Sequence, residues 1–336
     1  MPKFADLGLL VISWGLVAAI LALFSTFSIA ATAFFGTLLF LAASYTASRV
    51  VEGRRKAADR VASHVVLIAF IIALLPLISL VFETVSKGME RFDIQYFSHS
   101  MRNVIGEGGG AGHAINGTLI VTGIATLISV PIGLFTSIYL VEYGKGALKR
   151  AITFFVDVMT GIPSIVAGLF AYALFSILFG LGTRNGLAGA IALSVLMIPY
   201  VVRSAEEMLR LVPNELREAS FALGVPKWRT VLKVVIPTAL SGIVSGVMLA
   251  IARVMRETAP LLITAGLSAS MNTNPLSGNM TTLPVFVYYQ YITPGIPHEP
   301  YYARAWAGAL TLIIIVMLLN LLGRFIAKRF APKTNR

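Results

Sequence analysis

Apolar runs of about 20 residues alternate with short polar segments along nearly the whole chain. An α-helix of that length crosses the hydrocarbon core of a bilayer. The pattern predicts eight spans, near residues 9–27, 29–48, 61–82, 114–141, 151–180, 187–203, 238–265 and 305–323. We therefore expect an all-α polytopic membrane protein with one membrane domain, although 336 residues could form two or three soluble domains.

The composition supports this interpretation. Hydrophobic residues make up 57% of the chain, charged residues 12%, and the mean hydropathy is +0.83, which does not suit a water-facing surface. Cysteine is absent, so the chain offers no disulfide framework, metal thiolate or thiol redox chemistry. A net charge of +12 can indicate nucleic-acid binding, but basic residues held on one side of a membrane explain it without such a partner. We expect contact with membrane lipid and none with nucleic acid.

The distribution of basic residues sets the predicted orientation. Twenty of the 27 Lys and Arg residues fall in segments on one side of the eight spans, and five fall on the other. Because Lys and Arg concentrate in cytoplasmic segments, we expect a multi-pass protein of the cytoplasmic (inner) membrane with both termini inside. The predicted divisions are a hairpin with a basic loop at 1–60, a core at 61–325 and a basic tail at 326–336. Within the core, residues 204–237 form a cytoplasmic loop, and 83–113 and 266–304 form extracytoplasmic loops.

The first hairpin has a competing interpretation. Only Thr26, Phe27 and Ser28 separate its two apolar runs, and Ala31-Thr32-Ala33 could be the cleavage site of a secretory signal. The first run is longer than the usual signal core of about 7–15 residues, and cleavage would leave a short second span. A transmembrane hairpin is therefore the favoured prediction.

Several patterns that could carry enzyme chemistry lack the necessary context. The glycine run Gly106–Gly112 contains a G-x-G-x-x-A string, but no strand precedes it and no Lys-Ser or Lys-Thr pair closes it. We expect a flexible loop there and no ATP site in this chain. The histidines His64, His99, His113 and His298 lack metal-ligand spacing. No catalytic residue, metal site or bound cofactor is predicted, so the chain is not expected to be an enzyme.

Charged residues within the seventh predicted span form one candidate site. An ionised side chain at mid-bilayer costs about 2.5–3.5 kcal/mol on insertion scales, so Arg253, Arg256 and Glu257 need partners or a watery cavity. Their spacing of three and four residues would place them on one helix face, and Pro260 would weaken the helix beside them. The arginine fork suits a tetrahedral oxyanion. A substrate path and a structural ion pair both remain open.

The 204–237 loop forms a second candidate site. Leu216, Ala219, Ser220 and Leu223 would share one face of a short helix, and Gly224 would end that helix in a left-handed conformation. Trp228 with nearby Lys and Arg is typical of a helix lying at the membrane surface. An interfacial anchor is therefore the alternative to a functional loop.

The order of residues in this loop resembles the coupling loop of ABC importer permeases. Glu218, Ala219 and Ser220 precede Gly224 at the family spacing, and Val234, Ile236 and Pro237 close the pattern. The resemblance implies that Glu218, Ala219, Ser220, Gly224 and Pro237 couple the chain to a separate ATP-hydrolysing subunit. ATP and Mg would be bound by that partner, through the loop at 216–237.

Further runs resemble one family of these permeases, the PstA phosphate permeases, over residues 113–325. They are Asn116–Leu119, Pro131–Gly133, Tyr139–Tyr143, Gly161–Phe170, Arg256–Leu262 and Leu283–Pro284 before Val287-Tyr288-Tyr289. At the position directly before the run Glu257-Thr258-Ala259-Pro260, the family usually has glycine and this chain has Arg256. The resemblance implies a six-helix type I ABC importer permease core, preceded here by the N-terminal two-helix hairpin.

The same resemblance implies function and partners. The chain would move inorganic phosphate by alternating access, with Arg253, Arg256, Glu257 and Thr258 in the translocation path. A homologous second permease subunit, two ATP-binding subunits and an extracytoplasmic phosphate-binding protein would complete the importer. Three alternatives remain: a permease for phosphonate, sulfate or molybdate, a non-transporting membrane scaffold or sensor, and a secondary carrier. The small residues Gly242–Gly246 could pack against a partner subunit or within the chain.

Overall fold

The computed structural model describes residues 5–24 and 28–330, and within them all regular structure is helical. Seven helices are long and apolar enough to cross a membrane, and a bent pair would make an eighth span. The prediction of an all-α polytopic membrane protein is therefore confirmed. The chain divides into two compact units, Met1–Phe82 and Glu83–Arg336, which are described separately.

Unit 1 contains a helical hairpin and most of a long third helix. The hairpin helices are α1 (Ala5–Leu23) and α2 (Ile29–Glu52), and the third helix is α3 (Arg54–Met89). Gly36 permits close packing of α2 on Trp14 of α1, since an added Cβ would lie 2.8 Å from that ring. Arg60 of α3 pairs with Asp6 at 2.8 Å and with Glu52 at 3.0 Å, which ties all three helices together. Thr26 and Phe27 of the expected turn lie outside the described residues.

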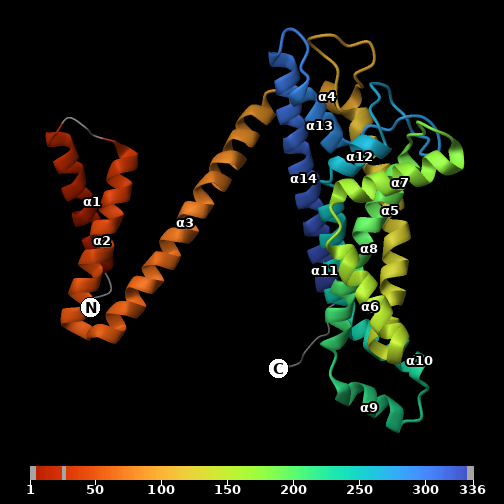
Figure 1. The fold of residues 1–336 in the computed structure, drawn as a ribbon, viewed down its shortest axis with the longest axis horizontal. Coiled ribbons are helices and arrows are strands. Elements are labelled where there is room, and N and C mark those ends of the chain that lie inside the picture. The colour runs from red at the N-terminus through yellow and green to blue at the C-terminus, as the bar shows by residue number, and fades with distance from the viewer. Residues whose placement is uncertain (1–4, 25–27, 331–336) are drawn as a thin grey trace. The chain divides into compact units, whose positions relative to one another are not determined.

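Unit 2 contains the remaining helices. They are α4 (Ile94–Ser98), α5 (Gly112–Ile138), the π-helical turn η1 (Tyr139–Tyr143), α6 (Gly146–Thr160), α7 (Ser164–Phe179), α8 (Gly186–Arg210), α9 (Asn214–Ala222), α10 (Lys227–Thr230), the π-helical turn η2 (Val231–Val235), α11 (Ile236–Val254), α12 (Ala259–Thr264), α13 (Leu283–Ile292) and α14 (Glu299–Phe330). Figure 1 shows α9 and α10 at one end of this unit and α4, α12 and α13 at the other. Helices α5, α8, α11 and α14 run between the two ends.

Helix α8 occupies the centre of unit 2, because small residues let its neighbours approach closely. Against α5, an added Cβ on Gly133 would lie 2.6 Å from Val201. Against α11, a Cβ on Gly242 would overlap Met208, and one on Gly246 would overlap the hydroxyl of Ser204. The sequence left open whether the small residues 242–246 pack against a partner subunit or within the chain. In the structure they pack against α8 of the same chain.

Two predicted spans are interrupted. The run at 151–180 is divided into α6 and α7, which meet at an angle of 107° across Gly161–Pro163. Pro163 lacks the amide hydrogen that a continuous helix would use, and it disfavours a helical conformation at the residue before it. The span predicted at 151–180 thus consists of two helices, and the bent pair can still count as one span.

The second interruption lies in the predicted seventh span, 238–265. Helix formation begins earlier, at Lys227, and runs through η2 into α11, which ends at Val254. Residues 255–258 are not helical, and α12 then begins with Pro260 in its first turn. The expected shared helix face of Arg253, Arg256 and Glu257 is therefore wrong, because Arg256 and Glu257 lie in the break between two helices.

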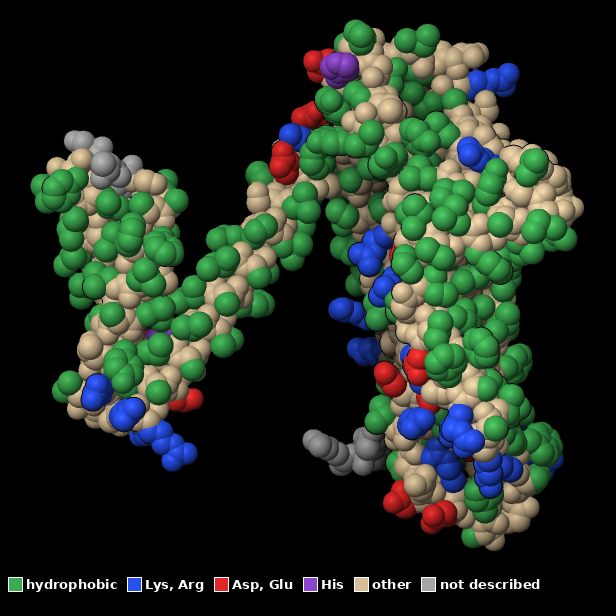
Figure 2. Space-filling model, in the orientation of Figure 1, with side chains coloured by type: hydrophobic (Ala, Val, Ile, Leu, Met, Phe, Trp, Pro, Cys, Tyr) green, Lys and Arg blue, Asp and Glu red, His purple; other side chains and the backbone are tan. Residues whose placement is uncertain are grey.

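The surface of unit 2 matches a membrane setting. Figure 2 shows hydrophobic side chains over much of its length and Lys and Arg side chains gathered at the end that carries α9 and α10. In water such an apolar surface would drive aggregation, whereas lipid tails solvate it. The unit thus has an apolar body and one strongly basic end.

Candidate functional site

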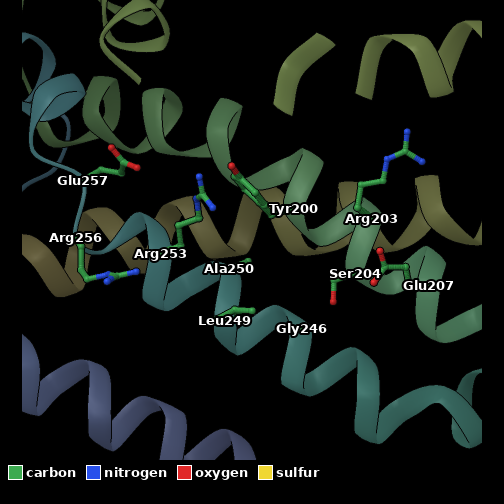
Figure 3. Close-up of a pocket in the computed structure, with 10 residues that line it drawn as sticks. All are labelled: Tyr200, Arg203, Ser204, Glu207, Gly246, Leu249, Ala250, Arg253, Arg256 and Glu257. Atoms are coloured by element: carbon green, nitrogen blue, oxygen red, sulfur yellow. The ribbon is translucent and has the colours of Figure 1, made fainter. Parts of the chain in front are cut away.

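A cleft of about 570 Å³ lies between α8 and α11, and three of the four residues expected in the substrate path line it. Figure 3 shows Arg253 at the end of α11, with Arg256 and Glu257 in the segment that follows. The wall also includes Tyr200, Arg203, Ser204 and Glu207 of α8 and Gly246, Leu249 and Ala250 of α11. The structure therefore brings charged groups of two helices to one hollow.

Arg253 is positioned by an aromatic ring. Its guanidinium carbon lies 4.0 Å from the centre of the Tyr200 ring, a cation–π contact that orients the fork without using its N–H groups. Arg256 donates from Nε to the carbonyl oxygen of Ala252 at 3.2 Å, and both arginine side chains are exposed. The N–H groups of these forks can therefore meet an anion in the cleft.

Glu257 is half-buried beside them, but it does not lock them. Within residues 5–24 and 28–330, no carboxylate oxygen lies within 4.0 Å of the guanidinium of Arg253 or Arg256. In Figure 3 Arg253 and Glu257 point to the same side, and Arg256 points away. This geometry does not support the structural ion pair that was the alternative interpretation of these residues.

The two helix breaks face each other beside this cleft. A hollow of about 180 Å³ is lined by Thr160, Ile162 and Ser164 from the α6–α7 bend, by Arg253 and Val254 at the end of α11, and by Glu257 in the break that follows. Helix α7 also packs closely on α12, because an added Cβ on Gly168 would lie 2.6 Å from Cα of Pro260. The runs 161–170 and 256–262, separate in sequence, thus pack against each other.

Arg256 also reaches a third hollow, of about 660 Å³, with Asn320 and Arg324 of α14. Thr258 lies differently from the other expected path residues. It precedes α12, and its carbonyl oxygen accepts from the amides of Leu261 and Leu262, each at 3.1 Å. Thr258 does not line these three hollows, so its position gives it a role in starting α12.

The 204–237 loop carries a short surface helix, α9, as the sequence predicted. Gly224 has a φ of +73°, which confirms the expected left-handed end of this helix. Glu218, Ala219 and Pro237 are exposed, whereas Ser220 is buried and its hydroxyl lies 2.8 Å from the hydroxyl of Thr230. The expected common face of α9 is thus divided, because Ser220 faces α10 while Leu223 is 83% exposed.

A pair that sequence reasoning missed fastens this loop to the rest of unit 2. Arg217 donates from Nε and Nη2 to the same carboxylate oxygen of Glu142, at 3.1 and 3.0 Å, and both side chains are largely buried. Its Nη2 also donates to the carbonyl oxygen of Leu209 at 2.9 Å. Glu142 lies in η1 at the end of α5, and its backbone carbonyl accepts a hydrogen bond from Lys227. Glu142 and Arg217 are 75 positions apart, so only the fold reveals their contact.

A second missed network lies on α8. The buried carboxylate of Glu206 accepts from Arg203 at 2.7 Å and from Arg210 at 2.6 Å, and Arg203 also pairs with Asp157 of α6. The i, i+3 and i, i+4 spacing of these arginines was the available sequence signal. The network joins α6 to α8 and includes Arg203, which lines the cleft. In the described part of the chain, His, Asp and Glu form no group of three or more that could hold a metal ion.

The chain matches known proteins over most of its length. Residues 129–336 match the family model described as "Binding-protein-dependent transport system inner membrane component". A relative named "Phosphate transport system permease protein PstA 1", from Mycobacterium tuberculosis strain CDC 1551, is 46% identical over 82% of this chain and 91% of its own. A relative from Yersinia pestis, named "Phosphate transport system permease protein PstA", is 37% identical over 85% of this chain and 94% of its own.

Solved structures show the same fold at low sequence identity. A chain of the inward-facing MetNI methionine ABC transporter has a TM-score of 0.51 at 22% identity, over 66% of this chain and 95% of its own. A chain of the bacterial alginate ABC transporter, solved in complex with an alginate pentasaccharide-bound periplasmic protein, has a TM-score of 0.56 at 11% identity, over 81% of this chain and 96% of its own. These likenesses bear on the fold alone.

Proposed function

The chain belongs to the binding-protein-dependent transport system inner membrane components and, among them, to the PstA-type permeases, and from this membership we infer that it is the transmembrane permease subunit of an ATP-driven phosphate importer. The observation that carries this conclusion is the identity of 46% over 82% of the chain to a phosphate transport permease. As a permease subunit it is not an enzyme, and ATP with Mg would belong to its partner. The fold agrees, since its structural neighbours are chains of ABC transporters.

We propose that phosphate passes through the cleft between α8 and α11. Arg253 and Arg256 face this cleft with N–H groups available, and bidentate N–H···O contacts to a phosphate would offset part of its desolvation. Conduction needs weak, transient binding. Glu257, which lines the same cleft, would repel the anion and shorten its stay. Thr258 would contribute by holding the start of α12 beside the path.

The loop around α9 is the proposed link to ATP hydrolysis. Leu216 and Phe221 are exposed on the nine-residue helix α9, and Leu223 is exposed directly after it, at the basic end of unit 2. This arrangement suits insertion into an apolar groove of a partner. Glu218, Ala219, Ser220, Gly224 and Pro237 would form this coupling element with them. Nucleotide-driven movement of the partner would pull α9, and the Glu142–Arg217 pair would pass the movement to α5.

The proposed assembly has four further components and one orientation. A homologous permease subunit would complete the path, two ATP-binding subunits would bind the α9 ends, and an extracytoplasmic phosphate-binding protein would deliver substrate. By the positive-inside rule, the basic α9 end and both termini would lie in the cytoplasm and the loops at 83–113 and 266–304 outside.

ATP-dependent uptake of labelled phosphate, in cells that lack this chain and in cells with the chain restored, tests the proposal. We expect that restoring the chain restores uptake. Unlabelled phosphate should block this uptake, whereas sulfate, molybdate and phosphonate should not. Block by one of the other three anions would assign the path to that anion. Phosphate uptake that does not depend on the chain would favour the scaffold or sensor.

A further inference from the structure

A separate cavity lies at the end of unit 2 opposite α9, and its wall is mostly apolar, with a few polar groups among residues such as Met101, Leu267 and Ala269. It has a volume of about 190 Å³ and is bounded by His113 of α5, Ser268 after α12, Phe286, Gln290 and Thr293 in and after α13, and Tyr301 of α14. His113, Phe286 and Gln290 are buried, whereas Thr293 is exposed, so the cavity has a buried floor and an open rim. Since one water occupies about 30 Å³ of liquid, the volume holds a small hydrated ion.

A buried positive charge lies next to two of these residues, although Arg304 does not itself line the cavity. Its side chain contacts Gln290, and its guanidinium carbon lies 4.5 Å from the centre of the Tyr301 ring. Arg304 is 0% exposed, and within the described part of the chain no carboxylate lies within 4.0 Å of it. Its Nη1 donates to the carbonyl oxygens of Gly106 and Gly108 at 2.7 and 3.0 Å, while its Nη2 is buried without a hydrogen-bond partner. A buried cation without a counter-ion is costly, and a nearby anion lowers that cost.

Gln290 relays this polarity into the cavity. Its Oε1 accepts from Nε of Arg304 at 3.1 Å, so the oxygen end of the amide is committed to the arginine. The NH₂ end therefore remains to donate to whatever occupies the cavity. A donor, and not an acceptor, is presented at the floor.

His113 supplies the second buried group. It is 3% exposed, its ring packs edge-on against Phe286 with centroids 5.6 Å apart, and its Nδ1 has no hydrogen-bond partner although it is buried. The hydrogen bonds to Gly106 and Gly108 use only Nη1 of Arg304. Nη2 of Arg304 and Nδ1 of His113 remain buried without a hydrogen-bond partner in the described residues. None of the residues around this cavity is Asp or Glu.

We propose that the cavity bounded by His113, Ser268, Gln290 and Tyr301 is a binding site for a tetrahedral oxyanion, taken up as free inorganic phosphate at the extracytoplasmic mouth of the subunit. The inference rests on the proposed function, which places this end outside the membrane and phosphate in the path. The site is distinct from the α8–α11 cleft, with which it shares no lining residue. Phosphate released there would be held before it enters the path.

The decisive variant is Gln290→Glu. The new carboxylate keeps the size of the side chain and gives Arg304 the counter-ion that it lacks, so the fold is retained, while the cavity gains a negative charge. His113→Ala removes the other buried group. Tyr288→Phe is the matched control, because Tyr288 is an exposed residue of the same helix and does not line the cavity.

The measurement is equilibrium binding of labelled inorganic phosphate to the assembled importer in nanodiscs, without nucleotide or binding protein. An Arg253→Gln, Arg256→Gln background removes the proposed path site. In that background we expect saturable binding that Gln290→Glu and His113→Ala each weaken at least about tenfold, equivalent to 1.4 kcal/mol, and that Tyr288→Phe leaves unchanged. Binding absent from the background, or unaltered by Gln290→Glu, would overturn the site.

Two further arms separate the possible failures. Phosphate uptake by cells carrying the unaltered chain tests the importer itself, so normal uptake together with unaltered binding in Gln290→Glu would remove only the cavity proposal. Nanodiscs with and without phosphatidylglycerol distinguish a free anion from a lipid headgroup. Displacement of phosphate by the anionic lipid would overturn the assignment to free phosphate.

Discussion

Arg253 and Arg256 in the α8–α11 cleft and Arg217 in the 204–237 loop have opposite surroundings. Arg217 is largely buried, makes two hydrogen bonds to Glu142 and donates to a backbone carbonyl. Arg253 and Arg256 are exposed to the cleft, and in the described residues they have no carboxylate within 4.0 Å. An arginine whose donors are all used fixes a segment in place, whereas one with donors left can serve a ligand that comes and goes.

Replacing Arg253 should give the largest effect. In Arg253→Gln the cleft loses the charged fork that Tyr200 orients, and we expect phosphate uptake to fall by at least about tenfold, or 1.4 kcal/mol. ATP hydrolysis by the partner subunits should persist, because the 204–237 loop is unchanged in this variant. Uptake rates and ATPase rates of the same reconstituted importer measure both.

Arg253→Lys sharpens this test. This variant keeps the charge but loses the planar fork and weakens the stacking on Tyr200. Its uptake should therefore lie between that of the unaltered chain and that of Arg253→Gln. Arg184→Gln is the matched control, since Arg184 is exposed in the segment between α7 and α8 and does not line the cleft. Unchanged uptake in Arg253→Gln would mean that the unpaired arginines are not in the path.

Gly224→Val should have the next largest effect. A β-branched residue at φ +73° is strained by roughly 1–2 kcal/mol, so the end of α9 would shift and its fit to a partner would fail. We expect uptake to fall several-fold while ATP hydrolysis no longer responds to phosphate, with a normal amount of the chain in the membrane.

Gly278→Val is a suitable control, because Gly278 also has a positive φ, of +70°, but lies far along the chain in the segment between α12 and α13. If both variants lowered uptake equally, backbone strain and general misfolding would explain the loss. Normal uptake in Gly224→Val would remove the coupling role from this loop.

Exchanging the charges of Glu142 and Arg217 tests whether this ion pair holds the 204–237 loop against η1. Glu142→Arg and Arg217→Glu each leave like charges facing one another in a largely buried setting, where breaking a pair costs about 3–5 kcal/mol. We expect each to lower the thermal stability of the importer and its uptake several-fold. The double exchange should recover a large part of both.

Recovery in the double variant is the informative outcome, because it shows that the contact, and not either residue alone, carries the effect. If uptake fell without any change in stability, Arg217 would act on the partner directly. If the double variant recovered nothing, the contact between η1 and α9 would not be needed for coupling.

Ser220→Ala should have the smallest effect. It removes one hydroxyl from a buried pair with Thr230, and a hydrogen bond of this kind contributes about 1 kcal/mol. Because α9 remains held by Arg217, we expect a loss of uptake of no more than about threefold, measured as initial rates. A loss as large as that of Arg217→Glu would show that the Ser220–Thr230 contact is the principal attachment of α9.

Periodic patterns account for what was predicted correctly. Apolar runs gave the helical class and most span positions, because each helix satisfies its own backbone hydrogen bonds and needs only length and apolarity to be recognised. The left-handed end at Gly224 was also predictable, since glycine favours that conformation locally. The ordered residues from Glu218 to Pro237 and the run at 256–262 indicated the family, which the relatives confirm.

The interruptions were less accessible. Pro163 and Pro260 were visible in the sequence, yet proline within a span often only kinks a helix, so a 107° bend and a separate α12 depended on packing. The close contact of Gly168 with Pro260 shows that packing. It joins residues 92 positions apart, a separation at which one sequence carries no pairing information.

The sequence by itself determined the membrane class, the number of apolar segments, the exposed helix of the 204–237 loop and the residue types available to hold an oxyanion. Only the tertiary structure decided which charges are neutralised. It placed Glu142 on Arg217, left Arg253 and Arg256 open to a cleft, and buried Arg304 behind Gln290 without a carboxylate. The physical reason is that helix formation depends on neighbours within about four residues, whereas the free energy of a charge depends on every group within several ångströms, and those groups come from distant parts of the chain.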